Sequence, residues 1–179
     1  MGLLLAGVIA PRGAHAGDPV GTWAIEGTLK TTACARGRCQ SQQGNIQDFL
    51  VVESDGTFAF GTIPDPSCPS AMPVMGSWNQ KSSSKVKLKG ENLREWWAAV
   101  SLCSGTRIRG RRFRGRFDPD SGTLVVRQPA HATIQGIFVS IRVRGTFLAT
   151  RVDQSPFGAF TGSARGDVSR SWLGTLRVP

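Results

Sequence analysis

Residues 137–149 read Ile137-Phe-Val139-Ser-Ile141-Arg-Val143-Arg-Gly145-Thr-Phe147-Leu-Ala149. The odd-numbered positions are apolar or small, and Ser140, Arg142, Arg144 and Thr146 fall between them. Successive side chains of a β-strand point to opposite faces of a sheet. The alternation therefore predicts a strand with one face in a core and the other face in water.

The same alternation recurs along most of the chain and is broken by turn signals. Asp55-Gly56 and Asp118-Pro-Asp-Ser-Gly122 each separate two strand-like stretches, as in hairpins. Further candidate strands cover residues 20–28, 74–79, 85–89, 95–102 and 171–178. We therefore expect an all-β fold, an antiparallel up-and-down β-barrel of about 8–10 strands, with a β-sandwich as the alternative.

Three segments are less regular. Residues 31–44 and 63–73 are rich in Ser, Gly, Gln and Pro, and we expect them to be long loops held by disulfides. Residues 92–99 contain helix-forming Glu, Leu, Arg and Ala, but the pair Trp96-Trp97 and the following Val-Ser-Leu favour an extended strand.

The chain has 179 residues, which fits one domain. Residues 1–16 hold a short apolar run that ends in Ala14-His15-Ala16, the small-x-small pattern of a leader-peptidase site. We expect residues 1–16 to be a signal peptide, with a buried N-terminal strand as the alternative. Residues 17–179 would then form a single β-barrel domain that is periplasmic or secreted.

Four cysteines fit this compartment, because disulfides persist there. They are Cys34, Cys39, Cys68 and Cys103, and we expect the pairs Cys34–Cys39 and Cys68–Cys103. A zinc site is disfavoured, because four residues separate Cys34 from Cys39 and His131 is the sole histidine after position 16. We expect neither a metal nor another cofactor.

Gly21-Thr22-Trp23 opens the first candidate strand. A Gly-x-Trp at this place resembles the lipocalin (calycin) family, and avidin-like barrels open in a similar way. The resemblance implies that Trp23 closes one end of the barrel beneath a basic side chain, Arg144 or Arg151. It also implies that the barrel binds a small apolar or amphipathic ligand, for which the candidate cavity residues are Trp23, Phe58, Trp78, Val139 and Ile141.

Arginine is concentrated in residues 107–116, and the formal net charge of the chain is +10. The candidate basic surface comprises Arg107, Arg109, Arg112, Arg114 and Arg116, with Arg142 and Arg144 as neighbours. Guanidinium groups match phosphate and sulfate oxygens, so the alternative function is a cell-envelope module that binds a polyanion or a protein partner. The simpler interpretation is a solvated face that keeps strands of different molecules from pairing. We expect no nucleic-acid role and no membrane-spanning segment.

Catalytic groups are sparse. His131 stands alone in an expected loop, and carboxylates such as Glu26 with Glu53 or Asp48 would have to meet inside the barrel to act together. Arg165-Gly166-Asp167 is interpreted as a turn. We therefore expect a non-catalytic binding protein.

Overall fold

The computed structural model describes residues 17–61 and 72–152. This part of the chain contains nine strands and one helix. In chain order they are β1 (Gly21–Ala35), β2 (Arg38–Val52), β3 (Thr57–Phe60), β4 (Val74–Ser82), β5 (Lys85–Gly90), α1 (Leu93–Ser104), β6 (Ile108–Gly110), β7 (Arg114–Asp118), β8 (Thr123–Ile134) and β9 (Ile137–Val152). The predicted all-β class and the predicted number of strands are confirmed.

The strands form one antiparallel sheet that closes into a ring of eight. Its order is β8-β7-β5-β4-β3-β2-β1-β9, and β9 pairs again with β8. The short strand β6 also pairs with β8, beyond the end of β7. Strands that are neighbours in the ring follow one another in the chain, with two exceptions: α1 and β6 lie between β5 and β7, and β1 closes the ring with β9. The connections are therefore those of an up-and-down barrel with one helical insertion.

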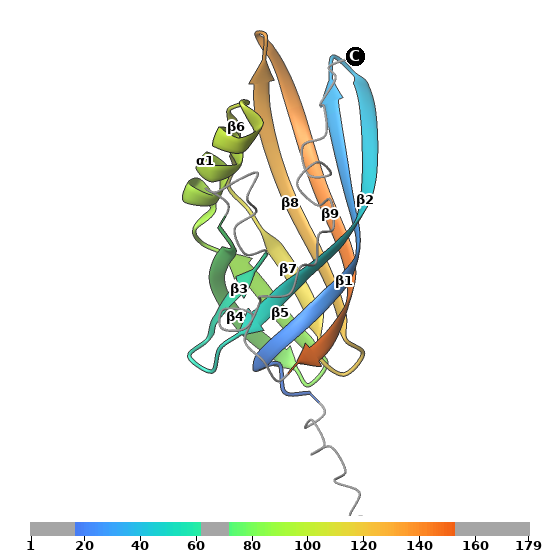
Figure 1. The fold of residues 1–179 in the computed structure, drawn as a ribbon, viewed down its shortest axis with the longest axis vertical. Coiled ribbons are helices and arrows are strands. Elements are labelled where there is room, and N and C mark those ends of the chain that lie inside the picture. The colour runs from blue at the N-terminus through green and yellow to red at the C-terminus, as the bar shows by residue number, and fades with distance from the viewer. Residues whose placement is uncertain (1–16, 62–71, 153–179) are drawn as a thin grey trace, which may run out of the picture.

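The strands differ greatly in length. β1, β2, β8 and β9 have 12 to 16 residues, whereas β3 has 4 and β5 has 6. In Figure 1 the hairpins β1–β2 and β8–β9 therefore rise far above the short strands, and α1 lies beside β6 at the upper left. The described helix is neither long enough nor apolar enough to cross a membrane.

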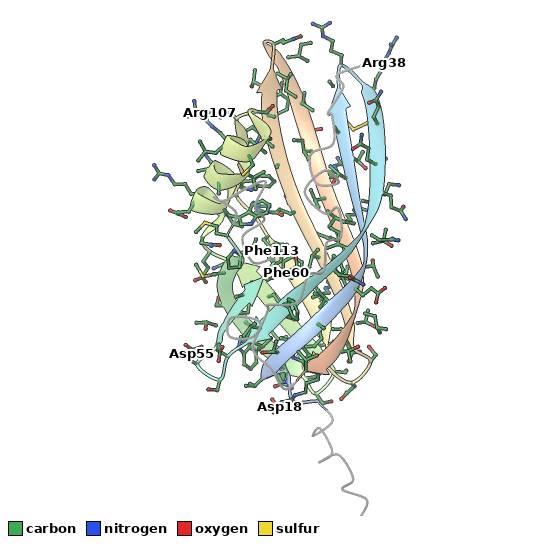
Figure 2. The ribbon with its side chains drawn as sticks, in the orientation of Figure 1. Asp18, Arg38, Asp55, Phe60, Arg107 and Phe113 are labelled. Carbon is green, nitrogen blue, oxygen red and sulfur yellow. A yellow bond between two sulfur atoms is a disulfide. The ribbon has the colours of Figure 1, made fainter. Side chains whose placement is uncertain are left out.

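Alternation places the core inside the ring. In β9 every second residue from Val139 to Ala149 faces inward, including the small Gly145, and β8 repeats the pattern from Leu124 to Ala132. At the end with the short strands, aromatic rings fill the interior. Phe113 contacts Phe60 at 5.5 Å and Phe58 at 6.0 Å between ring centroids (Figure 2). Such ring pairs add to the free energy gained by burying their apolar area.

Trp23 lies at the same end, next to the first residues of β1. Its ring packs edge-on against Phe117 at 4.8 Å, and its Nε1 donates to the carbonyl of Pro19 at 2.9 Å. Arg151 lies over the Trp23 ring, with Cζ 5.6 Å from the ring centroid, and Nη2 donates to the carbonyl of Val20 at 2.7 Å. Arg151 therefore covers Trp23, whereas Arg144 is exposed on the outer face.

The extended strand expected over residues 92–99 is wrong, because Leu93–Ser104 is α-helical. Leu93, Trp96, Trp97 and Val100 have the i, i+3, i+4, i+7 spacing of one helix face, and this face packs on the core. In a helix both tryptophans can be buried on one face. In a strand, adjacent residues would point to opposite faces, and one tryptophan would be exposed. Gly105, with φ of +65°, ends the helix in the left-handed conformation.

The long loop expected over residues 31–44 is also wrong. β1 and β2 continue as a hairpin to Ala35 and Arg38, and a two-residue turn at Arg36-Gly37 has φ of +48° and +77°. Positive φ at both positions matches the right-handed twist of the strands. Cys34 and Cys39 face each other in this ladder, and their predicted disulfide is confirmed.

Several predictions fall outside the described residues. They concern the signal peptide at 1–16, most of the loop at 63–73, Cys68, the strand at 171–178 and Arg165-Gly166-Asp167. Cys103 is disulfide-bonded, but Cys68 lies outside the described residues, so the pair Cys68–Cys103 stays a prediction.

Replacing Arg151 with Ala should lower the free energy of unfolding by about 1–3 kcal/mol, because a hydrogen bond and a cation–π contact are lost. Arg151→Lys keeps the cation and should lose less. Urea unfolding measures both, with Arg38→Ala at the exposed hairpin tip as the reference. Equal stability of Arg151→Ala and the unmodified chain would show that this cover contributes nothing.

Candidate functional site

The five candidate cavity residues occupy two separate regions of the barrel. Trp23 and Phe58 are buried at the end with the short strands, and the Nε1 of Trp78 donates to the carbonyl of Glu53 at 2.9 Å. Val139 and Ile141 are buried on β9. Trp23 pairs with Arg151 on β9, 12 residues from Val139, which corresponds to about 40 Å along a strand. The structure therefore does not bring the five together.

Two buried polar groups near Val139 and Ile141 have no hydrogen-bond partner among the described residues. They are Nε1 of Trp97 and Nε2 of Gln128, whose residues are 5% and 3% exposed. The Trp97 nitrogen lies against Gly110, so close that a β-carbon at this position would collide with it. Gly110 pairs with Ala130 on β8, two residues from Gln128 and on the same inward face. Both donors therefore belong to one part of the interior.

Ser101 holds α1 in the position that places Trp97. Its Oγ donates to the carbonyl of Trp97 at 2.6 Å and accepts from the backbone N–H of Ile108 at 2.8 Å. One hydroxyl thus joins the helix to the start of β6. The unpaired indole N–H consequently lies next to a backbone that is fixed by a hydrogen bond.

The proposed carboxylate pairs do not meet inside the barrel. Asp48 is buried on the inner face of β2, where its Oδ1 accepts from the N–H of Phe49 at 2.8 Å, whereas Glu26 and Glu53 are exposed. His131 lies in β8, not in a loop, and its ring stacks on Phe138 at 5.6 Å. In residues 17–61 and 72–152, no three His, Cys, Asp or Glu side chains are grouped so that they could hold a metal ion.

On the outside, cationic side chains line up across five neighbouring strands. Lys89 of β5 pairs with Arg114 of β7, Arg114 with Arg127 of β8, Arg127 with Arg144 of β9, and Arg144 with Lys30 of β1. All five are exposed. We call these five residues the cation row. Neighbouring strands are about 4.8 Å apart, so the row spans about 19 Å at the level of the backbone.

The other predicted arginines surround or leave this row. Arg116, one outward position along β7, pairs with Lys87, and Arg109 of β6 pairs with His131. Arg107 precedes β6 and lies on the outside near α1 (Figure 2). Arg112 lies in the segment between β6 and β7.

A depression of about 250 Å³ lies at the centre of the row. Five arginines line it, together with Gln128, Pro129 and Val143; the arginines are Arg112, Arg114, Arg127, Arg142 and Arg144. From the sequence, Arg142 and Arg144 were expected to lie near the arginine-rich segment 107–116. The pairing of β7, β8 and β9 brings them to it.

Carboxylates do little to neutralise the row. Among the described residues, the ion pairs within 4.0 Å are Lys89–Glu91 at 4.0 Å and Arg151–Asp18 at 3.9 Å. The three central arginines of the row therefore face one another without an ion-pair partner in the described part of the chain. Like charges placed directly opposite each other across strands destabilise a sheet.

Sequence reasoning missed Lys30, Lys89 and Arg127 as members of the site. Each is a single basic residue in an alternating strand, which is the usual pattern of a solvated face. Their common feature is the ladder position, which depends on how strands far apart in the chain align. The hairpin turns were the available signal, because turn length sets the register of the two strands it joins.

Repulsion within the row predicts how salt affects stability. Raising sodium chloride from about 10 mM to about 300 mM screens exposed charges and should raise the melting temperature. Arg127→Thr should stabilise the protein by about 0.5–1 kcal/mol at low salt and reduce the salt effect. Calorimetry measures both, with Arg38→Thr as the equal-charge control. Destabilisation of Arg127→Thr at low salt would contradict repulsion in the row.

Comparison with known proteins found no family model, no curated protein and no solved structure that matches this chain. Two features of the described residues bear on function: the buried donors inside the barrel and the cation row outside it.

Proposed function

We propose that this chain is a non-catalytic binding protein whose barrel takes up a small, mainly apolar molecule that carries a neutral hydrogen-bond acceptor. The observation that carries the proposal is the pair of buried donors, Trp97 Nε1 and Gln128 Nε2, which lack partners among the described residues. A ketone, ester or amide carbonyl has two lone pairs and can accept from two donors. The apolar remainder of such a ligand suits the inner residues Val139 and Ile141.

The two unpaired donors lower the stability of the protein when no ligand is bound. A buried donor without a partner destabilises a protein by about 1–3 kcal/mol. A leucine at position 128 or a phenylalanine at position 97 would avoid that loss at similar size. Groups that cost stability and lie close together are typical of binding sites, where the ligand supplies the missing partner.

The charge of the interior favours a neutral ligand over an anionic one. Among the described residues, Asp48 is the one buried charged residue, and buried cations are absent from the same set. A carboxylate ligand would lose its hydration and gain no positive partner there. A neutral carbonyl avoids this penalty.

The resemblance to lipocalins supports the same function. Gly21-Thr22-Trp23 opens β1, and Arg151 covers the Trp23 ring at 5.6 Å, as the resemblance implied for one of two basic residues. Lipocalins bind small apolar molecules inside their barrels. The Cys34–Cys39 disulfide supports a compartment outside the cytoplasm, which is the destination proposed for a chain with a signal peptide at residues 1–16.

Gln128→Leu tests the proposal. A fluorescent naphthyl ketone should bind the unmodified chain, and Gln128→Leu should weaken it about 10-fold, as expected for the loss of one buried hydrogen bond. Binding of a naphthyl hydrocarbon of the same size should stay unchanged, and the unfolding free energy should rise. Gln47→Leu, on the exposed face of β2, is the matched control.

Two results would contradict the proposal. Equal weakening of ketone and hydrocarbon would mean that Gln128 shapes the interior without donating to the ligand. Failure of both probes to bind the unmodified chain would mean that the barrel does not take up molecules of this class.

A further inference from the structure

We infer that the cation row is a binding site for a linear anionic polysaccharide whose charges are sulfate or phosphate groups. The row comprises Lys89, Arg114, Arg127, Arg144 and Lys30, with the depression of about 250 Å³ at its centre. This site lies on the outer surface of the barrel, and none of its five cations belongs to the site proposed for the interior, although Gln128 also borders the depression.

Protection of strand edges does not account for the row. Charged residues on edge strands stop molecules from pairing edge to edge. β5, β7, β8, β9 and β1 each have a partner on both sides in the closed ring. Their backbone groups are already paired, so cations are not needed there for this purpose.

Solubility does not account for the alignment either. Two unit charges about 5 Å apart in water repel each other by slightly less than 1 kcal/mol before screening by salt. The row contains four neighbouring cationic pairs, whose backbones lie about 4.8 Å apart and whose flexible side chains can hold the charges farther apart. A net charge of +10 spread over the surface would give the same solubility without this repulsion. An anion lying along the row would remove it.

The depression indicates the chemistry of the anion. Five arginines line it, from β7, β8, β9 and the segment before β7. A guanidinium group donates through a planar fork, and several forks can converge on a tetrahedral oxyanion from different sides. A carboxylate offers two oxygens in one plane, whereas sulfate and phosphate groups offer three outward oxygens. Arginines on several strands therefore favour sulfate or phosphate.

The curvature of the ring indicates the shape of the partner. A closed ring of eight strands has eight intervals between neighbouring strands. The five strands of the row span four of these intervals, roughly half of the circumference. A flat lipid surface would touch the middle of such an arc and leave its ends in water. A flexible linear polymer can follow the arc and contact all five side chains.

Within residues 17–61 and 72–152, no aromatic side chain lies at the outward positions next to the three central arginines, which favours a glycan over a single-stranded nucleic acid. Proteins that bind single strands stack the bases on aromatic side chains. The outward neighbours of the three central arginines, one position along each strand, are Arg112, Arg116, Val125, Pro129, Arg142 and Thr146. The first outward-facing ring on β8 is His131, four residues from Arg127, and it already stacks on Phe138.

The test compares two triple variants of the purified full chain that carry the same net charge. Arg114→Ser, Arg127→Ser and Arg144→Ser remove the centre of the row. Arg38→Ser, Arg94→Ser and Lys81→Ser remove three exposed cations elsewhere. Calorimetric titration with a heparin decasaccharide, and separately with deacylated lipopolysaccharide, distinguishes sulfate from phosphate as the source of the charge.

The row variant should bind the preferred glycan about 100-fold more weakly at 100 mM salt, because three charge-assisted contacts are lost. The control variant should change affinity less than about threefold. In a plot of log affinity against log salt concentration, the row variant should have a slope shallower by about three, since three fewer counterions are released. The decasaccharide should also bind more tightly than a disaccharide, which is too short to span the row.

Four outcomes would overturn the inference. Equal losses in the two triple variants would show that total charge alone matters. Equal affinity for disaccharide and decasaccharide would restrict binding to the depression. Tighter binding of an oligothymidylate with the same charge, or of phosphatidylglycerol vesicles, would replace the glycan with another partner. Failure of both glycans to bind would show that the cation row is not a glycan-binding site. The binding of the naphthyl ketone, which tests the interior, would not be affected by that result.

Discussion

The pairing of β1 with β9 is the constraint on which the rest of the structure depends. It runs from Thr22 opposite Val152 to Cys34 opposite Ser140 and joins the first described strand to the last. Once this pair forms, the ring has an inner and an outer face. The apolar residues of each alternating strand then point to the inner face and the polar residues to the outer face. The cover of Arg151 over Trp23 and the position of Lys30 next to Arg144 follow from this closure, which also encloses the aromatic core.

The alternation in residues 137–149 was sufficient to predict the strands, because a period of two is a local property of the chain. The hairpin at residues 31–44 was missed because its strands are polar, and only cross-strand pairing and the turn at Arg36-Gly37 reveal it. α1 was missed because two adjacent tryptophans were weighed by β-propensity, whereas packing against β6 decided the outcome. Tertiary contacts prevailed over local preference in both places.

The candidate sites were harder to predict than the strands, for the same reason. A cluster such as residues 107–116 is visible in the sequence, but a row needs register, and register depends on contacts between residues far apart in the chain. Arg127 is a single basic residue in the sequence of β8. It becomes part of a cationic row only because the sheet places it between Arg114 and Arg144. Likewise, neither Trp97 nor Gln128 is unusual alone. Their lack of partners appears only after burial is known.

Alternation also keeps the two proposed sites separable although they share β8. The Arg127 side chain faces outward and the buried Gln128 side chain faces inward, although Gln128 also borders the outer depression. A change from arginine to serine at an exposed position leaves the inward face intact, and a change from glutamine to leucine at position 128 leaves the net charge intact. Because the backbone between them is held by ladder pairs to β7 and β9, each substitution acts on its own face of the sheet. The barrel can therefore carry an apolar site and an anionic site on one strand, with stability lost locally at each and recovered when its own ligand binds.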